Sequence, residues 1–293
     1  MIHTIDLHFR GLRQNIAAFL AETEVGPVLV ETGPHSTLPN LLKGIKVAGY
    51  QAEDIQHVFL THIHLDHAGA AWWFAERGAT IYVHPRGSKH LARPERLMAS
   101  ARQIYQDKMD ELWGQMNPIA AERIVEVVHD TTQPGGLHAW YTPGHAVHHV
   151  AWQLEDDLFT GDVAGVRING GVVIPPCPPP DIHLGHWQES LALLRSIAPQ
   201  RLYLTHFGPI DYEEVHLTEL HERLIRWADW IKPYAERGAS VPELTPLYQK
   251  MVDDEFAALG ISAEDRARYE AANPSWMSVA GLLRYWAKHG LSN

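Results

Sequence analysis

The chain contains the stretch Thr61-His62-Ile63-His64-Leu65-Asp66-His67. It offers three imidazole rings and one carboxylate, which are donors that Zn²⁺ and similar ions prefer. The apolar run 58–60 predicts a short buried strand just before it. At a strand end, His62 and His64 are expected to point to the same side, because alternate residues of a strand share a face. Helix formers follow the stretch, so Asp66 and His67 should lie on the turn into a helix. One loop could therefore offer ligands to two neighbouring metals.

Three later segments repeat one pattern, in which an apolar strand is followed by a small or turn residue and then by a ligand-type side chain. They are Thr142-Pro143-Gly144-His145, Leu158-Phe159-Thr160-Gly161-Asp162 and Leu204-Thr205-His206. Each segment alone is weak evidence for a metal site. Together with the first stretch they make chance a poor explanation, and they predict a metal centre to which several strand ends contribute ligands.

The rest of the chain predicts a mixed fold that ends in helices. Strands and helices alternate early, a helix is expected over 94–117, and residues beyond 210 show only helical spacing, including 246–258 and 275–289. The proline run 175–180 should be extended, since proline fits neither a helix interior nor a central strand. We expect an α/β or α+β sandwich.

The same pattern predicts how the chain is divided. Residues 1–210 are expected to form the catalytic domain. Residues 211–293 are expected to form a helical C-terminal extension packed on it. A homodimer through these helices stays open.

Composition restricts the range of partners. The 293 residues carry 24 Lys and Arg against 35 Asp and Glu, a formal charge of −11, which disfavours binding to nucleic acid. The apolar run Ile16–Ala21 is too short for a signal peptide, and no segment is long enough to span a bilayer. The single cysteine, Cys177, cannot form an intramolecular disulfide. We expect a cytoplasmic protein that acts on a small molecule, with no membrane partner.

The quoted residues resemble those of the metallo-β-lactamase superfamily, over roughly residues 1–210. The resemblance implies a four-layer αβ/βα sandwich with two sheets face to face and helices outside. It also implies a site for two divalent metal ions. Zinc is expected first, with iron or manganese as alternatives, since all accept these ligands. In the family pattern, His62, His64 and His145 would hold one metal, Asp66, His67 and His206 the other, and Asp162 would bridge them.

Such a site predicts a dinuclear hydrolase that uses a metal-bound hydroxide, because two cations about 3.5–4 Å apart can share a hydroxide and polarise a carbonyl. Asp66 is the candidate catalytic residue that orients this hydroxide and handles its proton. The favoured substrate is an ester or thioester of a small organic molecule. Lactonases of this family place a tyrosine three residues after the bridging aspartate, where this chain has Gly165. The glyoxalase II signature after that aspartate is also not intact.

Several alternatives stay open from the sequence. A lactonase or phosphodiesterase of the same fold would share the ligand pattern, and so would a persulfide dioxygenase with a single iron. Glu31, which stands where the family usually has aspartate, could brace the metal loop or lie in solvent. His149 is expected to form structural hydrogen bonds. No ligand role is assigned to His84, His90, His148, His183 or His186.

Overall fold

The computed structural model describes residues 1–290, and these form two compact units. The first unit comprises Met1–Tyr141, His148–Gly161 and Pro199–Asp211. The second unit comprises Thr142–Val147, Asp162–Ala198 and the described residues from Tyr212 onward. The chain thus passes between the units several times. The expected division at residue 210 stays a prediction, and the last three residues of the predicted extension, 291–293, lie outside the described residues.

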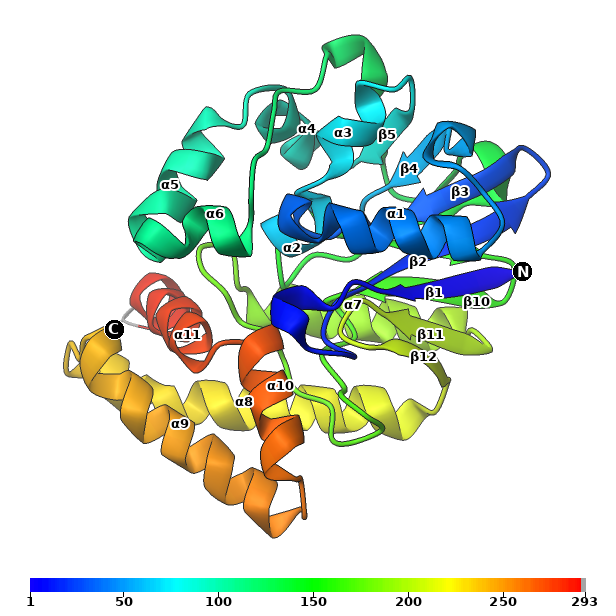
Figure 1. Ribbon diagram of the computed structural model, residues 1–293. Helices are drawn as coiled ribbons and strands as arrows, with labels where there is room; N and C mark the ends of the chain where they lie inside the picture. The colour runs from blue at the N-terminus through cyan, green and yellow to red at the C-terminus, as the bar shows by residue number, and fades with distance from the viewer. Residues whose placement is uncertain (291–293) are drawn as a thin grey trace. The chain divides into compact units, whose positions relative to one another are not determined.

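The first unit contains two six-stranded sheets (Figure 1). In the first sheet the strands lie in chain order: β1 (Ile2–Asp6), β2 (Ala17–Thr23), β3 (Gly26–Val30), β4 (His57–Phe59), β5 (Thr80–Val83) and β6 (Ile124–Glu126). The spatial order in the second sheet is β12 (Gly208–Asp211), β11 (Arg201–Leu204), β10 (Asp157–Gly161), β9 (Val150–Leu154), β8 (His138–Tyr141) and β7 (Thr131–Thr132). Strands β3 to β6 pair in parallel, as do β10 and β11.

Strand β2 shows why the two sheets pack face to face. Its side chains alternate between two cores, because successive residues of a strand point to opposite faces. Leu20 belongs to the core that the first sheet shares with helices, whereas Phe19 belongs to the core between the sheets. Trp152 and Phe159 reach that second core from the opposite sheet. The predicted two-sheet sandwich is therefore confirmed.

Helices of the first unit share a buried core with the first sheet. They are α1 (Leu38–Val47), α2 (Leu65–Ala68), α3 (Ala71–Ala75), α4 (Pro85–Ala92), α5 (Glu95–Tyr105) and α6 (Met109–Leu112). The prediction of one helix over 94–117 was wrong. It is interrupted at Gln106, whose φ of 47° lies outside the helical region and leads into a 3₁₀ turn, Gln106–Lys108.

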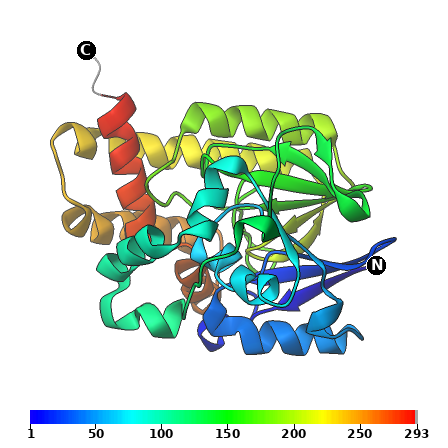
Figure 2. The same ribbon diagram turned by 90° about the horizontal axis from the view of Figure 1, so that it is seen from above.

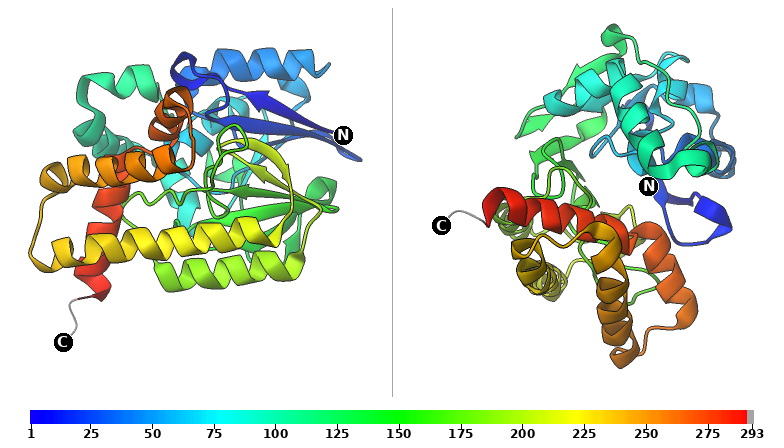
Figure 3. Two further views of the ribbon diagram at one scale, coloured as in Figure 1. Left: turned by 90° about the horizontal axis from the view of Figure 1, so that it is seen from below. Right: turned by 90° about the vertical axis from the view of Figure 1, so that its left-hand side faces the viewer.

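The second unit is helical apart from its loops. It contains α7 (Leu184–Ile197), α8 (Glu214–Glu236), α9 (Val241–Ala258), α10 (Ala263–Ala272) and α11 (Ser275–His289). Helix α7 runs beside α8 (Figure 2), and α11 packs on both α8 and α9 (Figure 3). Sequence patterns did not predict α10, because Tyr269 is its one buried residue and it shows little apolar spacing. Within residues 1–290 no helix is long and apolar enough to cross a membrane.

Candidate metal centre

The histidine-rich stretch follows β4 directly and is held in place from both sides. The backbone carbonyl of Thr61 accepts a hydrogen bond from the amide of Val150 at 2.8 Å. The carbonyl of Leu60 accepts one from the indole nitrogen of Trp152 at 3.0 Å. Helix α2 then begins at Leu65. The ligand-type side chains therefore leave a backbone that both sheets of the first unit anchor.

His62 and His64 direct ring nitrogens at each other, as their spacing predicted. Nε2 of His62 lies 2.9 Å from Nδ1 of His64. The His62 side chain is buried and that of His64 is half-buried. Two imidazole nitrogens that meet in this way offer a cation two neutral donors from one short segment.

Asp66, His67 and His206 form a second group in the same unit, although His206 is far away in the sequence. Oδ2 of Asp66 lies 3.4 Å from Nε2 of His206 and 3.7 Å from Nε2 of His67. Ligands bonded to one tetrahedral metal at about 2.1 Å lie roughly 3.4 Å from one another. The spacing of these three donor atoms therefore fits a single cation.

The second unit brings together the other two predicted ligands. Nε2 of His145 lies 3.3 Å from Oδ2 of Asp162. Nδ1 of His145 lies 2.9 Å from the backbone carbonyl of Pro176 in the proline run. The loop after Asp162 is held in turn by the indole of Trp187, which donates to the Val163 carbonyl. The proline run, which the sequence predicted to be extended but not to contact a ligand, thus orients a predicted ligand.

Backbone carbonyls decide which nitrogen of two histidines is available to a metal. Nδ1 of His206 lies 2.8 Å from the carbonyl of Asn15, and His145 makes the equivalent contact with Pro176. A carbonyl oxygen only accepts, so Nδ1 must donate its proton in both rings. In the neutral imidazole the lone pair then lies on Nε2, the nitrogen that faces the partner carboxylate. These donors fit a divalent metal.

Glu31 braces the metal loop, which decides between its two predicted roles. Its side chain is buried, and Oε1 accepts hydrogen bonds from Nδ1 of His67 at 2.9 Å and from the Thr61 hydroxyl at 2.5 Å. The Thr205 hydroxyl lies 3.4 Å from the same oxygen. Glu31 has a φ of 65°, a left-handed conformation that costs a residue with a Cβ about 1 kcal/mol. These hydrogen bonds help to hold it there.

Sequence interpretation missed three residues beside the ligands. Thr61 and Thr205 each precede a ligand histidine and both contact Glu31. The repeated Thr-His pair was the signal that could have identified them. His148, which was given no ligand role, places its ring centre 5.7 Å from that of His64 and is buried. The ring of His149 lies 5.1 Å from that of His62. No sequence pattern marks His148 as a neighbour of the metal loop.

The surroundings of Cys177 make its thiol a poor candidate for a catalytic nucleophile. Cys177 is buried in the proline run, and burial raises the pKa of its thiol well above the usual range. A thiol that resists deprotonation is a poor nucleophile. Cys177 therefore packs in the loop and is not a candidate nucleophile.

Comparisons with known proteins identify the family to which the chain belongs. The sequence profile of the metallo-beta-lactamase superfamily matches residues 12–206. The metallo-beta-lactamase fold-containing protein ST1585 of Sulfurisphaera tokodaii is 29% identical over 223 residues, covering 72% of this chain and 84% of that protein. An N-acyl homoserine lactonase of Bacillus cereus is 26% identical over 162 residues, 47% of this chain and 58% of that protein.

Solved structures give the same fold. The crystal structure of ST1585 matches with a TM-score of 0.62 at 24% identity, covering 76% of this chain and 86% of that one. The metallo-beta-lactamase family protein TTHA1429 of Thermus thermophilus matches with a TM-score of 0.67 at 19% identity, covering 99% of this chain and 93% of that one. The fold is thus the predicted αβ/βα sandwich with a helical C-terminal region. The chain belongs to the metallo-beta-lactamase superfamily and is a metal-dependent hydrolase.

Proposed function

We propose that this protein is a dinuclear metal-dependent hydrolase that cleaves an ester or thioester of a small organic molecule. The observation that carries the proposal is the donor geometry of two groups, Asp66 with His67 and His206, and His145 with Asp162. The family pattern supports joining them in one centre. In that centre His62, His64 and His145 would hold one metal, Asp66, His67 and His206 would hold the other, and Asp162 would contact both.

Each part of the site has its own task in this reaction. Bound divalent cations would supply an activated water at neutral pH and polarise the substrate carbonyl. Asp66 has a partly exposed side chain whose Oδ2 faces the two histidines, and its carboxylate is the group that accepts a proton from the attacking water. Glu31 keeps the His67 ring in position through its hydrogen bond with Nδ1 of that ring. The identity of the metal is part of the proposal, with zinc first and iron or manganese as alternatives.

The choice of bond rests on three further observations. A relative is named as an N-acyl homoserine lactonase, and a lactone is a cyclic ester, so lactones are the second candidate. A lactonase-type tyrosine cannot be built at Gly165, where φ is 82° and an added Cβ would lie 2.8 Å from the Ile174 carbonyl. An open ester or thioester does not depend on that residue. The net charge of −11 disfavours phosphodiesters.

A substrate panel tests the proposal. We expect the purified protein to turn over at least one acyl ester or thioester faster than a matched lactone and a matched phosphodiester. His62→Ala and Asp162→Ala should each abolish that turnover, while His8→Ala, which changes an exposed histidine, should leave it intact. Full activity in either ligand variant would overturn the proposal. Preferential lactone hydrolysis would move the protein to the second candidate.

A persulfide dioxygenase with one iron is the alternative from another class of enzyme. It would consume oxygen in the presence of a persulfide and would leave every ester of the panel intact. Oxygen uptake by the protein as purified therefore separates the two functions. We expect no oxygen uptake.

A further inference from the structure

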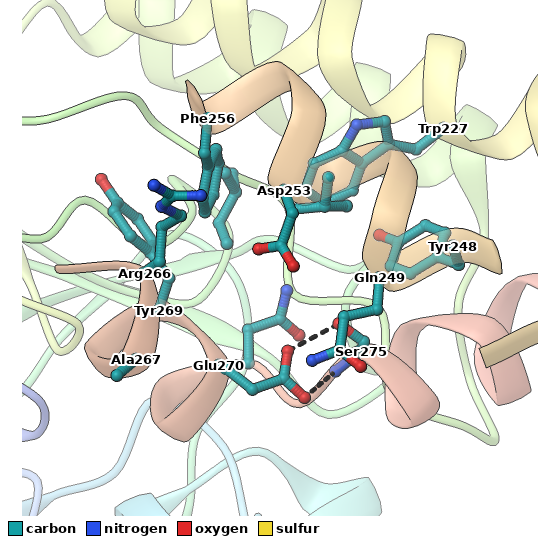
Figure 4. A pocket seen from close by; sticks show the side chains of 13 residues that line it. Trp227, Tyr248, Gln249, Asp253, Phe256, Arg266, Ala267, Tyr269, Glu270 and Ser275 are labelled. Carbon is teal, nitrogen blue, oxygen red and sulfur yellow. Dashed lines mark hydrogen bonds between the residues drawn. The ribbon is translucent and has the colours of Figure 1, made fainter. Parts of the chain in front are cut away.

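The second unit contains a cavity of about 150 Å³ between α8, α9, α10 and the start of α11. Figure 4 shows its lining side chains, none of which is a predicted metal ligand. Its inner wall is apolar and buried, with Trp227 and Phe256 as the largest members. Gln249, Asp253 and Ala267 are exposed and mark its opening to solvent. An apolar wall with a few polar groups is the usual make-up of a small-molecule site.

The lining carries charges of both signs. Asp253 on α9 and Glu270 on α10 contribute carboxylates, and Arg266 on α10 contributes a guanidinium. Nε of Arg266 is buried and makes no hydrogen bond within residues 1–290. By contrast, Arg223 on α8 donates to Glu255 at 2.9 Å. A buried guanidinium nitrogen without an acceptor is costly, and a bound anionic group would satisfy it.

The carboxylates of Asp253 and Glu270 favour a cation in the same cavity. Glu270 accepts hydrogen bonds from the amide and hydroxyl of Ser275, at 3.0 and 2.6 Å (Figure 4). Burial is the main cause that raises the pKa of Glu270, and the charge of Asp253 adds to it. An ammonium group placed between these carboxylates would offset both effects, because it stabilises their charged forms.

We propose that this cavity binds a small zwitterion, an α-amino acid with an apolar side chain. Its ammonium group lies between Asp253 and Glu270, and its carboxylate pairs with Arg266. The side chain packs on Trp227 and Phe256. The volume suits this class, since a cavity of about 150 Å³ holds a molecule the size of benzene and excludes a nucleotide.

Calorimetric titration of the full chain with leucine, valine and phenylalanine tests the proposal. 3-Methylbutylamine and 4-methylpentanoate are the matched probes, because each keeps the leucine side chain and lacks one charge. We expect saturable binding of at least one amino acid, and affinities at least about tenfold lower for both single-charge probes. No binding of the amino acids up to about 10 mM, or equal binding of either probe, would overturn the proposal.

Two variants test which charged residue of the cavity binds which charged group of the amino acid. Asp253→Asn and Arg266→Gln should each weaken amino-acid binding about tenfold or more. Arg266→Gln should in addition leave the binding of 3-methylbutylamine unchanged. The control is Asp254→Asn, the same change one residue along α9, where the carboxylate pairs with Lys250 and does not line the cavity. Unchanged amino-acid affinity in Asp253→Asn or Arg266→Gln, with unaltered thermal unfolding, would contradict the assignment.

Discussion

Glu31 accepts a hydrogen bond from Nδ1 of His67 at 2.9 Å, with both side chains fully buried. The contact fixes which nitrogen of His67 faces Asp66, because Nδ1–H donates a hydrogen bond to the carboxylate and the lone pair then lies on Nε2, which is left for a metal. The same carboxylate binds the hydroxyl of Thr61, immediately before ligand His62. One side chain therefore braces two parts of the metal loop.

Replacing Glu31 should loosen the metal that His67 helps to hold. In Glu31→Gln the amide still fills the space but no longer carries the charge that stabilises the His67 proton. We expect metal affinity to fall about 10- to 100-fold, measured as metal kept per chain after dialysis against a graded chelator. Glu24→Gln makes the same change at an exposed turn and serves as the control. Equal metal retention in both variants would show that Glu31 does not support the site.

Gly161, directly before Asp162, should tolerate no side chain. Its φ is 49°, and an added Cβ would lie 2.4 Å from the hydroxyl oxygen of Thr61 and 2.7 Å from Nε2 of His149. Gly170 has a φ of 68° with nothing within 4 Å, so Gly170→Ala measures the backbone cost alone. We expect Gly161→Ala to lower the free energy of unfolding by about 1–3 kcal/mol more than Gly170→Ala does. Denaturant unfolding gives both values, and equal costs would contradict the predicted clash.

His216 should make stability depend on pH. Burial is the main cause that lowers its pKa from 6.5 to about 4; the nearby Arg167 also lowers it, while the hydrogen bond to the Ala164 carbonyl opposes the shift. The unfolded chain takes up a proton near pH 6.5, whereas the folded chain resists protonation down to about pH 4. The free energy of unfolding should therefore fall as the pH drops through this window, by up to about 3 kcal/mol.

Unfolding at several pH values checks the role of His216. His216→Gln removes the titrating ring, so the variant should lose less stability than the parent chain between about pH 6.5 and 4. The variant can differ from the parent chain in absolute stability without affecting the test. The quantity compared is the slope of the free energy of unfolding against pH. Identical slopes for the two proteins would contradict the assignment.

The buried thiol should resist modification in the folded protein. Burial raises the pKa of Cys177, and the residue has no solvent-exposed surface. We expect a thiol reagent to label less than about a tenth of the native chains in the time that labels the unfolded chain completely. Rapid labelling of the native protein would show that the proline run opens readily.

Local patterns made much of the fold and site predictable. The spacing of His62 and His64, and the short apolar strand just before them, depend on residues close in the sequence. The sequence could not decide between the two predicted roles of Glu31, because its bracing role depends on contacts with Thr61 and Thr205 from distant strands. The sequence also did not predict that α5 ends at Tyr105. Helical spacing continues past Gln106, but the backbone there takes a positive φ.

The central claim is that seven side chains hold two metals, and metal content tests it most directly. Elemental analysis would be made on protein purified without added metal, beside His62→Ala and Asp162→Ala. We predict about two metal ions per chain in the parent protein, fewer in each variant, and loss of ester or thioester hydrolysis together with the metal. One iron per chain, with oxygen uptake and no hydrolysis, would contradict the dinuclear hydrolase.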